Sequence, residues 1–171
     1  MGLMDILNQY ASPAIGNNTS GVGDHYDEVA RGAPPNVVGQ GLADAFRDDK
    51  TPPFGEMVGQ MFGQSDSQQR AGVLNQLLRS IAPGILATLG GGILGRMSAQ
   101  GSGSAPALTP EQASQITPAQ VQEIANHAEQ HDPTIIDKIG GFYADHPQVV
   151  KTLGSAALAI ALAGISNRMR A

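Results

Sequence analysis

Residues 109–124 of the chain read TPEQASQITPAQVQEI and contain two helix starts in close succession. Thr109 and Thr117 each stand directly before a proline, and a glutamine follows each of them three positions later. This is the capping-box pattern, in which the threonine oxygen accepts a backbone N–H and the glutamine side chain reaches back to the cap. Proline suits the first helical position because it has no N–H to leave unpaired. The stretch therefore predicts two helices, beginning at Pro110 and Pro118.

Apolar residues recur at the helical spacing of three and four positions on both sides of this stretch. No window alternates apolar and polar residues over the length of a strand. The sequence thus predicts an all-α fold, a multi-helix bundle. The clearest stripes are Val38, Leu42, Ala45 and Phe46; Phe54, Met57, Val58, Met61 and Phe62; Val73, Leu74, Leu77, Leu78 and Ile81; and Ile135, Ile136, Ile139, Phe142 and Tyr143.

Capping residues predict where several of these helices begin. Asp24 is the expected N-cap of a short helix, and Thr51, followed by two prolines, is the expected N-cap of the Phe54 helix. Asp66 or Ser67 caps the next helix. The last helix is expected to run without a break over about residues 147–168.

Residues 99–107, AQGSGSAPA, have the composition of a flexible linker. We therefore expect an N-terminal helical bundle over residues 1–98, this linker, and a C-terminal helical segment over residues 108–171.

Composition excludes several classes of chemistry. The 171 residues include 15 acidic and 10 basic side chains, for a net charge of −5, and no cysteine. Without cysteine there is no disulfide, thiolate zinc site, iron–sulfur cluster or cysteine nucleophile. Without a basic cluster there is no expected nucleic-acid partner.

The start of the chain lacks the basic region of a signal peptide, so a cytoplasmic location is predicted. Two uncharged stretches, residues 80–95 and 152–166, are shorter than the roughly 20 residues of a membrane span. We expect both to form core helices. The alternative is a peripheral membrane protein whose two Gly/Ala-rich helices, with basic residues at their ends, lie in the lipid interface.

Small residues repeat every four positions in both uncharged stretches. Such a strip lets a second helix backbone approach closely. The two strips fit a tight helix pair within the chain and also contacts between subunits. The predicted packing residues are Ala87, Gly91 and Gly95 in the first stretch with Ala99 just beyond it, and Ser155, Ala159 and Ala163 in the second.

Residues 90–95 also match the G-x-G-x-x-G pattern of dinucleotide-binding loops. That site requires a preceding strand and an acidic residue about 20 positions later. Here a helical pattern precedes the glycines and a linker follows them, so no cofactor is expected.

Glu123, His127 and His131 follow one another at four-residue intervals, which places a carboxylate and two imidazoles on one helix face. These are ligands for a transition metal, and a solvated helix face is the alternative. His25 stands among acidic residues in a second such cluster. No nucleophile motif or carboxylate pair points to catalysis, so no enzyme activity or small-molecule substrate is predicted.

The segments TPPFGEM at 51–57, QRAGVLN at 69–75 and DPTIID at 132–137 resemble small helical bacterial proteins of the DUF937 or YidB-like groups. The resemblance implies a bacterial, intracellular, non-enzymatic protein and transfers no site residues. Together with the small-residue strips, it predicts a self-associating helical protein, a homo-oligomer with a structural role.

Overall fold

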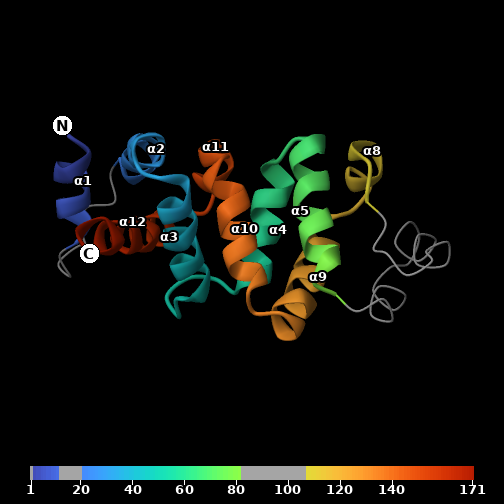
Figure 1. The fold of residues 1–171 in the computed structure, drawn as a ribbon. Coiled ribbons are helices and arrows are strands. Elements are labelled where there is room, and N and C mark those ends of the chain that lie inside the picture. Colours follow the sequence, from blue (N-terminus) through green and yellow to red (C-terminus); the bar gives the residue numbers. More distant parts are fainter. Residues whose placement is uncertain (1, 12–20, 82–106) are drawn as a thin grey trace. The chain divides into compact units, whose positions relative to one another are not determined.

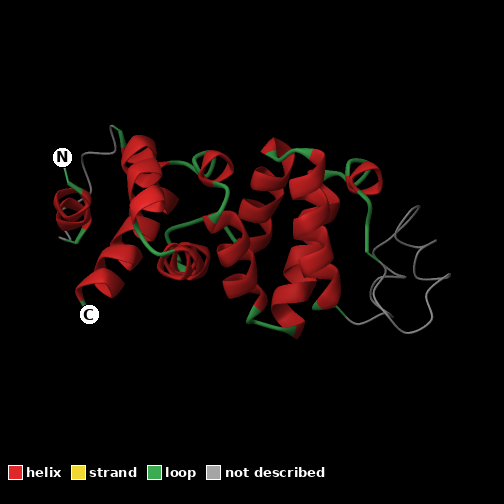
Figure 2. Cartoon of the chain, turned by 45° about the horizontal axis from the view of Figure 1, so that its top comes forward, coloured by secondary structure: helices red, strands yellow, loops and turns green. Residues whose placement is uncertain are grey.

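The computed structural model describes residues 2–11, 21–81 and 107–171, and these residues form helices joined by turns, with no strand among them (Figure 1 and Figure 2). The all-α prediction is confirmed. The helices are α1 Leu3–Tyr10, α2 Val22–Gly32, α3 Pro35–Arg47, α4 Phe54–Gln64, α5 Ser67–Arg79, α8 Pro110–Ala113, α9 Pro118–His131, α10 Ile135–Ala144, α11 Pro147–Val150 and α12 Ser155–Arg170.

The chain divides into two compact units. Unit 1 comprises Met1–Pro53 together with Ile136–Ala171, and unit 2 comprises Phe54–Ile135. Each unit therefore combines residues from before and after the predicted 99–107 linker, which differs from the expected division into residues 1–98 and 108–171. The difference arises because helices distant in sequence pack together, and composition does not reveal such contacts. The linker itself, apart from residue 107, lies outside the described residues.

Unit 1 is built around the pair α3 and α12. Helix α1 packs on α12 and α2, and α2 also contacts α12 and α11. Polar contacts join the same elements. Lys151 Nζ lies 3.3 Å from Asp27 Oδ2, and the Tyr10 hydroxyl lies 2.8 Å from His25 Nδ1. The core of the unit includes Leu7, Tyr26, Val29, Val38, Leu42, Phe46, Ile139, Tyr143, Leu158, Leu162 and Ile165.

Unit 2 is built around the pair α4 and α9, with α5 against α8, α9 and α4. Every apolar residue of the predicted Phe54 and Val73 stripes is buried. Asn75 ties α5 to the segment before α8, because its side chain accepts from Leu108 N at 2.7 Å and donates to Leu108 O at 3.3 Å. The stripes therefore predicted the inner faces of these helices correctly.

The starts of α5, α8 and α9 in unit 2 follow the local sequence closely. Capping boxes are present at Thr109 and Thr117, each with the glutamine three positions later, as predicted. Asp66 caps α5 in the same way, with Gln69 as the partner. Each box satisfies backbone groups that the first helical turn cannot pair internally.

Three boundary predictions are wrong. Thr51 does not cap α4; its hydroxyl donates to Ala45 O at 2.6 Å and Asp48 O at 2.8 Å, and so closes the end of α3. Asp24 lies inside the first turn of α2, because Gly21 at φ 81° provides the helix entry. The C-terminal helix is broken between α11 and α12 by a turn in which Gly154 has φ 78°.

Candidate functional site

One close helix packing in unit 1 lies where α3 crosses α12. Gly41 faces this crossing so tightly that a Cβ atom there would lie 2.5 Å from Ile165 Cγ1 and 2.7 Å from Ala161 O. A Cβ atom on Gly164 would lie 3.2 Å from the Gly41 Cα. The two backbones are therefore in direct contact, which only glycine allows at these positions.

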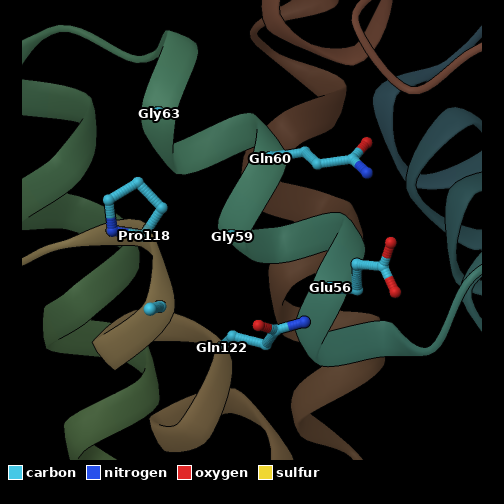
Figure 3. Close-up of a pocket in the computed structure, with 7 residues that line it drawn as sticks. Glu56, Gly59, Gln60, Gly63, Pro118 and Gln122 are labelled. Atoms are coloured by element: carbon cyan, nitrogen blue, oxygen red, sulfur yellow. The ribbon is translucent and has the colours of Figure 1, made fainter.

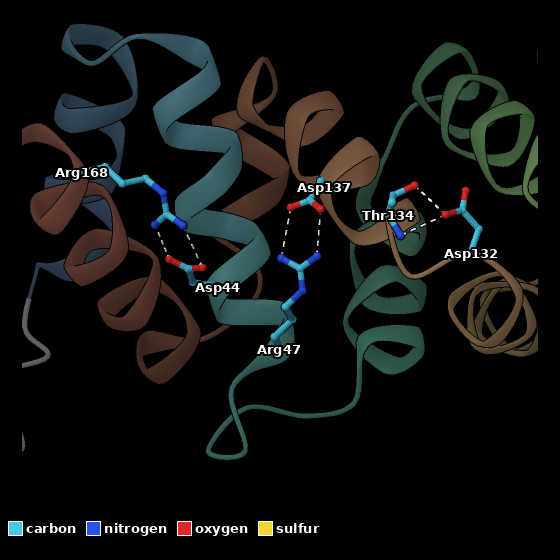
Figure 4. A network of polar contacts seen from close by, with 6 residues as sticks. All are labelled: Asp44, Arg47, Asp132, Thr134, Asp137 and Arg168. Carbon is cyan, nitrogen blue, oxygen red and sulfur yellow. Dashed lines mark hydrogen bonds and ion pairs between the residues drawn. The ribbon is translucent and has the colours of Figure 1, made fainter. Parts of the chain in front are cut away.

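Two Arg–Asp pairs flank this crossing (Figure 4). Arg168 on α12 reaches Asp44 on α3, with 3.1 Å between Nη2 and Oδ1, and Arg168 Nη1 also donates to Gly164 O at 3.2 Å. Arg47 on α3 donates to both carboxylate oxygens of Asp137 on α10, at 3.1 and 2.8 Å. Both pairs are bidentate, so they fix the rotation and register of α3 against α10 and α12.

These contacts also shift protonation. The hydrogen bonds from Arg47 hold the pKa of Asp137 below its ordinary value, and the charges of Arg47 and Arg168 act in the same direction. The hydrogen bond to Asp44 raises the pKa of the Arg168 guanidinium. Asp137 and Arg168 are therefore charged at neutral pH and serve as contacts between helices.

The predicted strip on α12 lies beside this crossing. Ser155 is exposed, and Ala159 and Ala163 are half-buried. The residues of α12 that are fully covered within the chain are instead on the neighbouring face: Ala157, Leu158, Ala161, Leu162, Gly164, Ile165 and Ser166. The partner strip, Ala87, Gly91, Gly95 and Ala99, lies outside the described residues together with the G-x-G-x-x-G segment 90–95, so the predicted pairing of the two strips stays a prediction.

A second glycine contact, not predicted from the sequence, joins α4 to α9 in unit 2. Gly55, Gly59 and Gly63 are spaced by four residues and follow the face of α4 that meets α9. A Cβ atom on Gly55 would lie 2.7 Å from Gln122 O, and one on Gly59 would lie 3.0 Å from Pro118 O. The signal was present in the sequence, since the spacing is the one used to select the other two strips.

These glycines leave a shallow hollow of about 460 Å³ between α4 and α9 (Figure 3). Glu56, Gln60 and Gln122 border it with their polar side chains, and Gly59, Gly63, Pro118 and Ala119 complete the lining. Its lining contains a single carboxylate, that of Glu56, and no imidazole or hydroxyl. Such a lining offers hydrogen bonds without an acid–base or nucleophilic pair.

The metal-site prediction on α9 is not supported by the geometry. Within the described part of the chain, no group of three or more His, Asp or Glu side chains is placed to hold a metal ion. Glu123 and His131 are both exposed and His127 is half-buried. The first and third of these residues are about 12 Å apart along the helix, because each residue rises 1.5 Å, so one ion cannot reach all three.

His25 is likewise placed in a structural contact, facing the Tyr10 hydroxyl. The acidic residues around it line a hollow of about 340 Å³ with Arg31, and one of them, Asp27, pairs with Lys151. Tyr26 in the same helix is fully buried. Burial, with a further contribution from Asp27, raises the pKa of its hydroxyl, so the side chain stays neutral.

None of the described helices combines the length and apolar character needed to cross a bilayer. The basic residues near α12 are engaged by other side chains. Lys151 lies near Asp24 and Asp27, Arg168 pairs with Asp44, and Arg170 donates to Asn8. The carboxylate contacts of Lys151 and Arg168 reduce the basic charge that the peripheral-membrane alternative would present to lipid.

No family model, curated protein or solved structure matches the chain. The resemblance to the DUF937 and YidB-like groups therefore stays a prediction.

Proposed function

We propose that the protein is a non-enzymatic, self-associating helical protein with a structural role, which packs through small-residue faces of its helices. The observation that carries the proposal is the position of Ser155, Ala159 and Ala163 on α12. One side of α12 is fixed against α3, and on the adjacent side these three residues contribute only hydroxyl and methyl groups to the surface.

A helix approaching these three residues meets little side-chain bulk and no charged group at their positions. Close backbone approach gains van der Waals contact over a long strip at small cost in side-chain entropy. Helix α12 itself is already held by Asp44 and by the Gly41 crossing, so it need not be ordered when a partner binds.

The test is the mass of the full chain in solution as Ala159 and Ala163 are replaced by Leu, singly and together. Because a leucine separates two backbones that touch across an alanine, we expect the wild type above its 17.6 kDa monomer mass and the double variant at that mass. Native mass spectrometry and light scattering measure this directly.

Gln40→Leu serves as the matched control, since it adds the same side chain at an exposed site on α3. It should leave the assembly unchanged. Thermal unfolding of each variant separates loss of assembly from loss of fold. A wild-type chain that remains at the monomer mass at every concentration would exclude the proposal.

A further inference from the structure

Unit 1 is held together by contacts between two segments that are far apart in the chain. Residues 1–53 contribute α1, α2 and α3, and residues 136–171 contribute most of α10, together with α11 and α12. The Gly41 crossing and the Asp44–Arg168 and Arg47–Asp137 pairs all join one segment to the other. Unit 1 is therefore an interface between two chain segments, with all of unit 2 inserted between them.

The α10 sequence resembles that of α4 in its pattern of residue types. Residues 51–64, TPPFGEMVGQMFGQ, align without gaps with residues 132–145, DPTIIDKIGGFYAD. The alignment places Pro52 on Pro133 and Gly59 on Gly140, and it matches Glu56 with Asp137. The buried and exposed positions of the two helices also coincide over most of this length.

The helices that precede them correspond in the same way. Helices α3 and α9 each begin with proline, at Pro35 and Pro118, and each has a buried valine three residues later, at Val38 and Val121. Residues 35–47, PNVVGQGLADAFR, and 118–130, PAQVQEIANHAEQ, have nearly the same order of buried and exposed positions. The chain thus contains two similar helix pairs, α3 with α4 and α9 with α10.

Each helix of one pair packs on a helix of the other pair. In unit 1 a Cβ atom on Gly140 of α10 would lie 2.5 Å from Gly39 O of α3, and in unit 2 the matching Gly59 of α4 faces Pro118 O of α9. In both units a glycine therefore faces the backbone of the proline-led helix, at the fifth residue of α3 and at the first residue of α9. In both, the two helices come from different pairs.

We propose that this exchange of helices also takes place between two copies of the chain, so that residues 1–53 of one copy form unit 1 with residues 136–171 of another. The partner is a second copy because every contact it needs is already present in unit 1. This proposal rests on the proposed self-association and gives it a specific interface. Reciprocal exchange closes a dimer, and exchange with successive copies extends a chain of subunits.

The two Arg–Asp pairs allow a test with complementary full-length variants. One variant carries Asp44→Arg with Arg47→Asp, and the other carries Asp137→Arg with Arg168→Asp. Neither pair of substitutions changes the net charge. Alone, each variant places like charges together at both contacts, whether it is monomeric or exchanged with itself. Only exchange between the two variants restores opposite charges at all of these contacts.

The variants are unfolded, mixed at about 1 mM, which is the order of the effective concentration within a flexible chain, and refolded together. We expect a mixed dimer of twice the 17.6 kDa monomer mass, with its unfolding midpoint raised to that of the control. The control is a single chain carrying all four substitutions, in which the contacts are repaired without a partner. If the control folds and the mixture remains two separate monomers with unimproved midpoints, exchange is excluded.

A milder pair keeps the test decisive if these variants fold poorly. Arg47→Asp and Asp137→Arg, in separate chains, alter only the pair whose side chains are 44% and 51% exposed. The same readouts apply. A wild type that self-associates without mixed-dimer formation would leave the α12 strip as the interface. Mixed dimers from variants that also carry Ala159→Leu and Ala163→Leu would instead show exchange without that strip.

Discussion

Replacing Gly41 by alanine should destabilise unit 1, whereas replacing Gly141 by alanine should stabilise it. Both glycines lie inside helices with ordinary negative φ, so alanine gains up to about 1 kcal/mol at either site from helix propensity and a less flexible unfolded chain. The surroundings differ. A Cβ atom at Gly141 has no neighbour within 4 Å, while one at Gly41 meets the Ala161 carbonyl oxygen at 2.7 Å.

The Ala161 carbonyl oxygen is part of the backbone and cannot rotate away from the added methyl group, so α12 must move away from α3. Substitutions that overpack a core in this way cost about 2–3 kcal/mol. Subtracting the propensity gain leaves a net loss of about 1–2 kcal/mol for Gly41→Ala. For the 171-residue chain that corresponds to a fall of about 2–8 °C in the unfolding temperature. Gly141→Ala should raise stability by about 0.5–1 kcal/mol.

Urea unfolding followed by circular dichroism measures both values, with the slope of the transition showing whether the unfolded state has changed. Comparing Gly41→Ala with Gly141→Ala controls for helix propensity, since both variants replace glycine by alanine inside a helix. Equal stability of the two variants would show that α3 and α12 are not in backbone contact, and the account of unit 1 would fail.

Two further predictions use the same reasoning. In unit 2, Gly55→Ala should lower the free energy of unfolding by about 1–2 kcal/mol, because its Cβ atom would lie 2.7 Å from Gln122 O. Gly63→Ala should be neutral or stabilising, because its Cβ atom would lie 3.6 Å from Pro118 Cγ. Urea unfolding measures both changes, and similar losses at the two sites would contradict the prediction. For the Arg47–Asp137 pair, the pKa of Asp137 is lowered by folding, so its contribution is complete above the ordinary value of 3.8 and is lost as pH falls through the folded value. Because both side chains are about half exposed, the pair contributes at most about 1 kcal/mol to stability. Asp137→Asn should remove that part of the acid dependence of stability between about pH 5 and pH 2. An unchanged profile of unfolding free energy against pH would refute the prediction.

The helices could be predicted because their signals are local. The capping boxes at Thr109 and Thr117 need only residues three positions apart, and an apolar stripe such as Phe54 to Phe62 reports burial whatever covers it. Thr51 shows the limit of this reasoning, since the same Thr-Pro pattern closes the preceding helix here. Which end a polar side chain satisfies depends on the path of the chain.

The local sequence pattern does not predict which helices pack against each other. Gly39 and Gly41 lie two positions apart and match no helical strip, yet they meet two different helices, α10 and α12. Nothing near Asp44 in the sequence indicates that Arg168 is its partner. The predicted strip at Ser155, Ala159 and Ala163 was selected by spacing alone, and the covered face of α12 proved to be the adjacent one.

The order of segments in unit 1 bears on when exchange can compete with the monomer. Closing a chain across the roughly 80 residues of unit 2 costs entropy that grows only slowly with length, so residues 136–171 of the same copy remain at an effective concentration of order millimolar. A second copy offers the same contacts without improving them, and in dilute solution the closed monomer should dominate. Exchange becomes competitive where copies are held close together, as they would be when the α12 surfaces associate. The two interfaces would then act in sequence, with the small-residue strip raising the local concentration at which the segments exchange.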